Sequence, residues 1–409
     1  MPSSQLTDVD LADPHTFLNR DLHELWRSLR TNSPVYWNPP SESAPGFWAV
    51  MRYRDVVDVY RDSDRFTSTR GNVLATLLQG HDSASGQMLA VSDGPRHRAT
   101  RALLLKSFTP KALAPVISKV HARTRRLIAQ AVDRDEVDFA TDVADQIPIN
   151  TIGDLMNVPE YDRPQLVNWN TMSLASDGAG GGELDEILAR NEILMYFADL
   201  AEHRRREPGD DVVSALANGT IDGEPLTEDE IVLNCYSLVL GAEQSSRMSS
   251  IGGVLALAEN HDEWRRFKDG SVGLDTATEE ILRWTTPAMH MGRRALTDVE
   301  IGGQAIATDD IVTLWNTSAN FDDEVFTDPT RLDLGRKPNK HVAFGLGAHF
   351  CLGAFLGRTH LTAALEAVRD LVRSVEVSAP PRRLFSNFVL GYTNAPVRLH
   401  GEPTGSAGQ

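Results

Sequence analysis

One loop in the C-terminal part of the chain combines residues that could hold a planar metal cofactor. Residues 344–353 read FGLGAHFCLG, with three glycines and a single cysteine, Cys351. Glycine tolerates positive φ and lets the backbone approach another group closely. Cys351 lies where the loop meets an expected helix, whose N-terminal N–H groups and dipole would stabilise a thiolate. A lone thiolate in such a loop suits the axial ligand of a planar metal cofactor.

Other kinds of site are conceivable for the same loop. The dinucleotide-binding pattern G-x-G-x-x-G fails here, because Phe350 stands at the third glycine position. His349 near Cys351 could suggest a catalytic Cys–His pair, although the two side chains would point in different directions. An inert, buried cysteine is the plainest alternative.

The elements that must position this loop are expected to be mainly helices. The longest helical segment, 227–258, starts with a capping box of Thr227 and Glu230 and would span about 48 Å. A last helix is predicted over 351–374. Nearly all of residues 96–285 has helical patterning, with breaks expected at Pro110, Pro148, Pro159, the glycines of 178–182 and Pro208-Gly209.

Strands are expected on both sides of this helical body. The runs 35–37 and 47–51 predict a strand pair, and 299–301 with 304–306 flank the hairpin signal Gly302-Gly303. Residues 311–315 and 384–400 also have strand character. No linker divides the chain, so we expect one domain over 1–409, mainly α with small β-sheets (α+β), with flexible termini at about 1–8 and 401–409.

The composition excludes several classes of protein. The chain has 40 Lys+Arg and 57 Asp+Glu, a net charge of −17, which disfavours a protein that coats nucleic acid. Two cysteines, Cys235 and Cys351, are too few for a disulfide scaffold or a Cys-rich zinc site. The N-terminus lacks an apolar signal segment and no long apolar run occurs, so we expect a cytoplasmic protein with no membrane partner.

The 344–353 loop resembles the haem-binding loop of the cytochrome P450 family, F-G-x-G-x-H-x-C-x-G, at every fixed position. The resemblance extends over nearly the whole chain and implies the cytochrome P450 fold and haem b as cofactor. It makes Cys351 the thiolate ligand of the iron, with Gly345 and Gly353 in the same cofactor-binding loop. Phe344 matches the aromatic residue beside the sulfur, and His349 a usual contact of a haem propionate.

Charged residues elsewhere match further positions of the family. His97 and Arg101 are four residues apart, on one helix face, and resemble the family's partners of the haem propionates. Arg293 matches another propionate arginine. Taken alone, each of these residues would more often be an ordinary surface charge.

Glu280 and Arg283 resemble the family's E-x-x-R pair, in which i and i+3 share a helix face. The third partner implied by the resemblance is Arg331, with Arg336 as a rival. Their implied role is structural, on the side of the haem that carries the thiolate.

The long helix carries a segment similar to the family's oxygen-activating segment. Residues 241–246 read GAEQSS, and Glu259-Asn260-His261 sets the register. In this register small residues, Gly241 and Ala242, leave room for dioxygen and substrate over the iron.

The same register puts Gln244 at the family's acid and Ser245 at its threonine. Glutamine cannot ionise, so we predict altered proton delivery through Ser245, water and Gln244. Glu243 lies about 100° around the helix from Gln244. A shift of one residue would restore an acid at Glu243 but put Gln244 at the threonine position.

Substrate contacts are predicted from position alone. His290 could anchor a polar group of the substrate, although a core histidine is the plainer alternative. The candidate contacts are residues 72–91, the loop 174–181, Leu240, Gly241, Ala288, Met289, His290, Met291, and the turn 388–392 with Val389.

The resemblance implies a monooxygenase that inserts one atom of O2 into an apolar small molecule, an intermediate of secondary metabolism. Electrons would come from a ferredoxin and a ferredoxin reductase, with basic residues near 336–340 and 101–106 as a docking patch. Whether the substrate is free or bound to a carrier protein stays open. Two alternatives remain: a peroxide-driven or oxidative-coupling enzyme with altered proton delivery, and a non-catalytic haem sensor.

Overall fold

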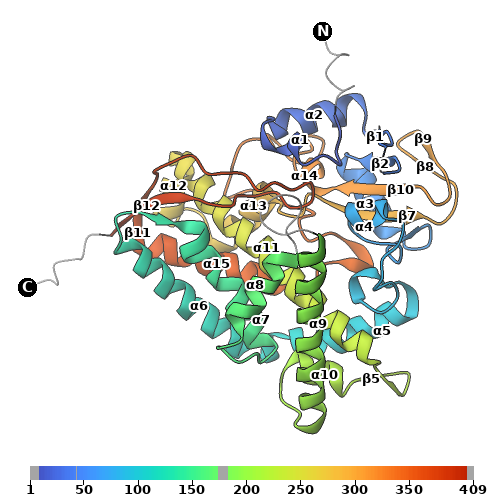
Figure 1. The fold of residues 1–409 in the computed structure, drawn as a ribbon. Coiled ribbons are helices and arrows are strands. Elements are labelled where there is room, and N and C mark those ends of the chain that lie inside the picture. Colours follow the sequence, from blue (N-terminus) through green and yellow to red (C-terminus); the bar gives the residue numbers. More distant parts are fainter. Residues whose placement is uncertain (1–8, 43, 174–182, 403–409) are drawn as a thin grey trace, which may run out of the picture.

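Helices form most of the molecule, and small sheets lie beside them. The computed structural model describes residues 9–42, 44–173 and 183–402. Figure 1 shows the N-terminal helices and the largest sheet on one side, and most of the longer helices on the other together with β11 (Val372–Val377) and β12 (Pro396–Gly401). The long helix α11 (Glu228–Glu259) runs through the middle. The prediction of a mainly α fold with small β-sheets is confirmed. The predictions for 1–8, 174–181 and 403–409 fall outside the described residues.

The element bounds follow the sequence patterns closely. The helices are α1 His15–Leu18, α2 Leu22–Asn32, α3 Tyr53–Arg61, α4 Leu74–Leu78, α5 Gly94–Leu105, α6 Pro110–Val132, α7 Gln146–Leu155, α8 Arg163–Ser173, α9 Glu183–Arg206, α10 Val212–Ala217, α11, α12 His261–Lys268, α13 Leu274–Thr285, α14 Asn316–Ala319 and α15 Ala354–Leu371, with a π-helical turn at Ala140–Ala144 and short 3₁₀ turns at Leu89–Val91, Lys106–Phe108 and Gly347–His349. In this described part of the chain, none of the helices combines the length and the apolar character needed to span a membrane.

The central helix α11 begins as its sequence predicts. The Thr227 hydroxyl accepts from the Glu230 N–H at 3.2 Å, and the Glu230 carboxylate accepts from the Thr227 N–H at 2.9 Å. The same carboxylate accepts from the Arg96 Nε of α5 at 2.8 Å. The capping box therefore starts the longest helix and also ties it to the helix that carries His97 and Arg101.

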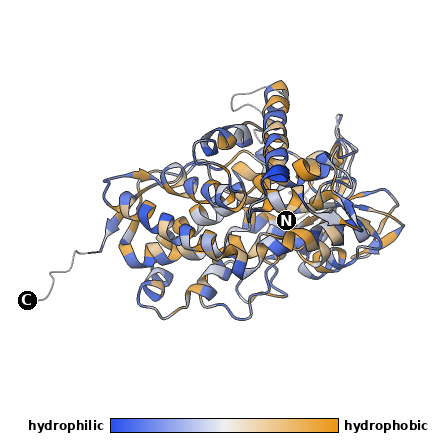
Figure 2. Cartoon of the chain, turned by 90° about the horizontal axis from the view of Figure 1, so that it is seen from below, coloured by the Kyte–Doolittle hydropathy of each residue, from blue (hydrophilic) through white to orange (hydrophobic). Residues whose placement is uncertain are grey.

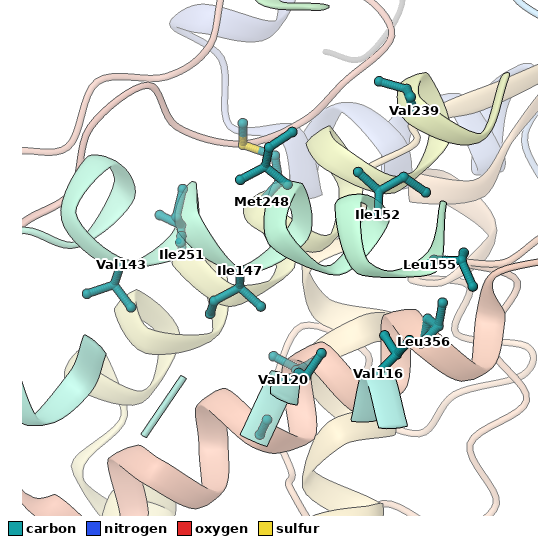
Figure 3. Packing of buried hydrophobic residues seen from close by; sticks show 14 of the residues in the cluster. Val116, Val120, Val143, Ile147, Ile152, Leu155, Val239, Met248, Ile251 and Leu356 are labelled. Carbon is teal, nitrogen blue, oxygen red and sulfur yellow. The ribbon is translucent and has the colours of Figure 1, made fainter. Parts of the chain in front are cut away.

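The main core lies around α11. Figure 3 shows Val239, Met248 and Ile251 of α11 packed near Ile147 and Ile152 of α7, with further residues from α6 and α15. Hydrophobic and hydrophilic residues alternate along most helices in Figure 2, as expected for helices that bury one face. Packing of this kind fixes α11 between the helices that surround it.

The largest sheet has five strands in the order β1-β2-β10-β7-β3. The strands are β1 Val35–Asn38, β2 Phe47–Val50, β3 Phe66–Thr67, β4 Val137–Asp138, β5 Thr220–Ile221, β6 Glu224–Pro225, β7 His290–Ala295, β8 Val299–Ile301, β9 Gln304–Ile306, β10 Ile311–Trp315, β11 Val372–Val377 and β12 Pro396–Gly401. Antiparallel pairing of β7 with β10 places Arg293 opposite Val312. The predicted strand pair β1–β2 and hairpin β8–β9 are confirmed.

Three local predictions were wrong. Pro148 does not break the chain but lies inside the first turn of α7, where a missing N–H removes no helical hydrogen bond. The last helix begins at Ala354, three residues later than predicted, and ends at Leu371, because the alternating segment from Val372 pairs with β12. Within 384–400 the regular strand starts only at Pro396, and earlier residues form isolated bridges. The prediction of a single domain over 1–409 remains a prediction.

Candidate functional site

The loop before α15 is shaped by glycines. Gly345 and Gly347 have φ of 65° and 69°, in the left-handed region that side chains disfavour. A Cβ on Gly347 would lie 2.4 Å from the backbone oxygen of Tyr60 in α3. The Cys351 N–H donates to the Phe344 carbonyl at 2.9 Å, so the two ends of the loop are joined directly. This closure holds the cysteine in a fixed position at the start of α15.

Part of the Cys351 side chain is exposed, and protein atoms lie around the rest of it. Burial raises the pKa of its thiol, and the Gly353 N–H with the positive charges of Arg101 and Arg358 opposes that shift. These groups are the kind that stabilise a bound thiolate. In the described residues no group of three or more His, Cys, Asp or Glu could hold a metal ion.

The Phe344 ring packs beside this loop. The Arg358 guanidinium lies 4.6 Å from the ring centroid, and the Phe350 ring meets it edge-on at 6.2 Å. A Cβ on Gly357 would lie 3.2 Å from Phe344 Cε1, so the small residue leaves room for the ring. Phe344 thus lies between the loop and α15, and its place beside the sulfur remains a prediction.

Two histidines and an arginine gather above the loop. The rings of His97 and His349 are 4.3 Å apart, and Arg101 Nη2 donates to the Phe350 carbonyl at 2.6 Å. His97 is buried, and its Nε2 has no hydrogen-bond partner in the described structure. Burial, with the nearby His349 and Arg101, lowers the pKa of His97 to about 4. A buried nitrogen without a partner marks a place where a further polar group would fit.

Asp93, which the sequence reasoning missed, organises this group. One carboxylate oxygen lies 2.8 Å from His349 Nε2, and the other accepts from the Ser68 N–H at 2.8 Å. Burial alone would raise the pKa of the Asp93 carboxyl, but the hydrogen bonds from His349 and Thr67 hold it below its usual value. Only the Nδ1 of His349 is then free to meet a propionate, and that contact remains a prediction. Asp93 directly before Gly94-Pro95 was the available signal, since it is a typical N-cap position.

Arg293 lies buried on β7, with 5% of its surface exposed. Its Nη1 donates to the Gly292 carbonyl at 2.6 Å, and its guanidinium faces the Tyr60 ring at 5.6 Å. Burial lowers the pKa of Arg293 and raises that of Tyr60 to about 12. In the described residues no carboxylate pairs with Arg293 or Arg101. Two cations without acids and the unpartnered His97 nitrogen fit a ligand with two carboxylates, as haem b has.

The Glu280–Arg283 pair is fully buried, and its third partner is Arg336. Arg283 Nη2 donates to Glu280 Oε1 at 2.8 Å, and Arg336 Nε donates to Glu280 Oε2 at 3.1 Å. The prediction of Arg331 was wrong: its side chain is exposed, and only its carbonyl takes part, accepting from Arg336 at 3.0 Å. Arg331 lies in a turn that directs it outward, whereas Arg336 points back toward α13.

The segment 241–246 of α11 has one open side. No protein atom lies within 4 Å of a Cβ built on Gly241, and Ala242 is only half-buried. The Ser245 hydroxyl donates to the Gly241 carbonyl at 3.3 Å. The Gln244 Oε1 is buried without a partner in the described structure. These residues can hold water close to small side chains.

Glu243 is separated from this open side. It is buried and accepts a hydrogen bond from Asn170 of α8. Burial raises the pKa of its carboxyl, with partial opposition from Asn170 and Arg247. The structure therefore contradicts Glu243 as a catalytic residue, because its carboxyl is bonded on another face of the helix.

The residues predicted to line a substrate pocket divide into two groups. Met289 and His290 are fully buried, so the prediction that they contact substrate was wrong. Met289 packs in the core with Trp315. His290 Nε2 accepts from the Leu74 N–H at 3.3 Å, and burial lowers the pKa of His290 to about 3. The remaining candidates are partly or fully accessible: Leu240, Gly241, Ala288, Met291 and Val389.

Comparisons with known proteins agree along the whole chain. A sequence model of the family described as "Cytochrome P450" matches residues 274–382. Cytochrome P450 NovI of Streptomyces niveus is 42% identical over 97% of this chain and 98% of its own. Linalool 8-monooxygenase of Pseudomonas putida is 31% identical over 95% and 98%.

A solved structure shows the same fold. P450 OxyD, described as involved in the biosynthesis of vancomycin-type antibiotics, has a TM-score of 0.88 and 32% identity. The match covers 96% of this chain and 100% of that one.

Proposed function

The chain belongs to the cytochrome P450 family, and we propose that it inserts one atom of O2 into an apolar intermediate of secondary metabolism. Relatives named as monooxygenases support the reaction class. The observation that carries the proposal is that Arg101 bonds the cysteine loop and Arg293 lies over Tyr60, which the same loop contacts, while a buried nitrogen of His97 has no partner in the described structure. It gives one thiolate ligand and three donors for two carboxylates.

Haem b is the cofactor of this family, and when bound it supplies the chemistry that activates dioxygen. Cys351 would hold its iron, and Arg101, Arg293 and His97 would bind its propionates. Gly345 and Gly353 keep side chains out of the loop, and Phe344 packs beside it. The buried Glu280–Arg283–Arg336 group fixes the chain on that side.

Proton delivery in this proposal depends on Ser245 and Gln244. The Ser245 hydroxyl, bonded to the Gly241 carbonyl, can pass a proton between waters, and Gln244 can orient one of them. We expect Ser245→Ala to lower the amount of product formed per reductant consumed, because more of the reductant ends as peroxide. Gln244→Glu should raise this amount. The measurement is product formed per reductant consumed. Unchanged coupling in Ser245→Ala would remove Ser245 from the proton path.

A second candidate function is favoured by Gln244 alone. A peroxide-driven or oxidative-coupling enzyme needs less proton delivery than one that uses O2. Turnover with hydrogen peroxide and no electron donor, at a rate matching the donor-supported reaction, would favour this candidate over the first.

Electron supply by a ferredoxin and its reductase is part of the proposal. Lys337 and Lys340 are exposed near the cysteine loop, as are Arg98 and Lys106 on the other side. Arg336 does not belong to such a patch, because it is buried against Glu280. The overall charge of −17 makes local cations the means of attracting an acidic donor.

The substrate class is tested by spectroscopy. The likeness to P450 OxyD and NovI supports an intermediate of antibiotic biosynthesis, free or attached to a carrier protein. The purified ferric protein is titrated with apolar natural-product cores and with amino acids on carrier proteins, while the Soret band is followed. A high-spin shift with one class identifies it. A response only to steroids, with none to any natural-product core or carrier-bound amino acid, would contradict the proposal.

A further inference from the structure

One face of α11 is anchored to its neighbours by polar side chains. Val239, Glu243 and Arg247 follow one another at i, i+4 and i+8 and therefore share this face. Glu243 accepts from Asn170 of α8, and Arg247 pairs with Asp145 directly after the π-helical turn. Asn170 is completely buried and Glu243 is 7% exposed. A hydrogen bond inside the protein thus joins α8 to α11.

The anchored face lies opposite the open side of the helix. Gly241 and Ser245 are each two residues from Glu243, which at about 100° per residue puts both nearly half a turn away. Their surroundings agree, since nothing lies within 4 Å of a Cβ on Gly241. A rotation of α11 that moved Glu243 away from the Asn170 side-chain nitrogen would therefore also turn Gly241 and Ser245 away from their present direction.

Apolar packing beside this bond is incomplete. A narrow cavity between α7, α8, α9 and α11 has Ile152, Leu166 and Val239 among its lining residues. Dispersion contacts next to a gap are weakened and have no preferred direction, whereas a hydrogen bond has one. Removal of Asn170 would also leave a buried carboxyl without its donor. The bond is thus a directional contact that, together with the Arg247–Asp145 pair one turn further on, fixes the rotation of α11 at this point.

We propose that Glu243 is a positioning residue: by accepting from Asn170 it fixes the rotation of α11, so that Gly241 and Ser245 face the haem. It takes no part in proton transfer. This inference rests on the proposed function only in the identity of the cofactor.

The test uses the ferric holoenzyme and imidazole, a ligand of the haem iron. Imidazole affinity is measured from the Soret band in Glu243→Leu, Asn170→Ala and Glu243→Gln, together with hydrogen exchange of the amides of 241–247. We expect Glu243→Leu and Asn170→Ala to change the imidazole Kd several-fold and to speed exchange. Glu243→Gln retains an acceptor for Asn170 and should stay close to the wild type in both readouts.

The control is Thr278→Val, which removes the partly buried 2.9 Å hydrogen bond between Thr278 of α13 and Thr362 of α15. It should lower thermal stability without changing imidazole affinity. If Glu243→Leu and Asn170→Ala behave like this control, Glu243 has a merely structural role and the inference fails. If Glu243→Gln behaves like Glu243→Leu, the negative charge of Glu243 matters and its acceptance of the Asn170 hydrogen bond does not. That result would also overturn the inference. Neither readout needs the substrate, so failure of the proposed function would be seen separately.

Discussion

His360 lies within α15 with neither ring nitrogen hydrogen-bonded in the described structure. Burial lowers its pKa to about 4, so between about pH 6.5 and 4 the unfolded chain binds a proton that the folded chain does not. Stability is therefore lost as the pH falls through this range, by up to about 3 kcal/mol.

We expect His360→Leu to remove this loss. The measurement is the free energy of unfolding in urea at pH 7 and at pH 4.5. The change between the two pH values is compared for the variant and the wild type. The control replaces an exposed histidine, as His81→Gln. For this variant, the difference in unfolding free energy from the wild type should be the same at both pH values. The same result for His360→Leu would contradict the argument, since the buried ring would then titrate as it does in water.

At the scale of elements, the cysteine loop depends on the approach of Gly347 to α3. Gly347→Ala would bring a Cβ to 2.4 Å from the Tyr60 backbone oxygen, in addition to strain at positive φ. Gly270 also has positive φ, but nothing lies within 4 Å of its Cβ position, so Gly270→Ala separates strain from collision. We expect several-fold less haem per polypeptide in Gly347→Ala and a normal ratio in Gly270→Ala. Equal haem content in both variants would show that the contact with α3 is dispensable.

The buried ion group also acts at this scale, because it joins α13 to the segment 327–336. Arg336→Ala would take one of two cations from Glu280, which has no exposed surface but keeps Arg283, and the expected loss is about 1–3 kcal/mol of unfolding free energy. Arg331→Ala removes an exposed side chain and should cost less than about 0.5 kcal/mol. Urea unfolding followed by circular dichroism measures both. Similar losses in the two variants would restore Arg331 as the third partner.

The charge of the whole molecule sets the conditions for electron transfer. With a net charge of −17, the chain repels an acidic donor except near local cations such as Lys337 and Lys340. We expect Lys337→Gln with Lys340→Gln to slow reduction by a ferredoxin several-fold at low salt, and the difference to shrink at high salt. Stopped-flow reduction gives the rates. Arg205→Gln with Arg206→Gln, at the exposed end of α9, removes the same number of charges and is the matched control, and an equal slowing there would mean that only net charge counts.

The sequence by itself determined the features that arise from local chemistry. The glycines and Cys351 of the loop, the capping box of α11 and the Glu280–Arg283 pair all depend on neighbours within ten residues, so their patterns are visible in the chain. The tertiary structure decided the partners that come from distant segments: Asp93 for His349, Arg336 for Glu280, and Asn170 for Glu243. It also decided which side chains are buried at the start of β7, which removed Met289 and His290 from the pocket. Such choices depend on which elements pack together, and a pattern of spacing along one chain does not contain that information.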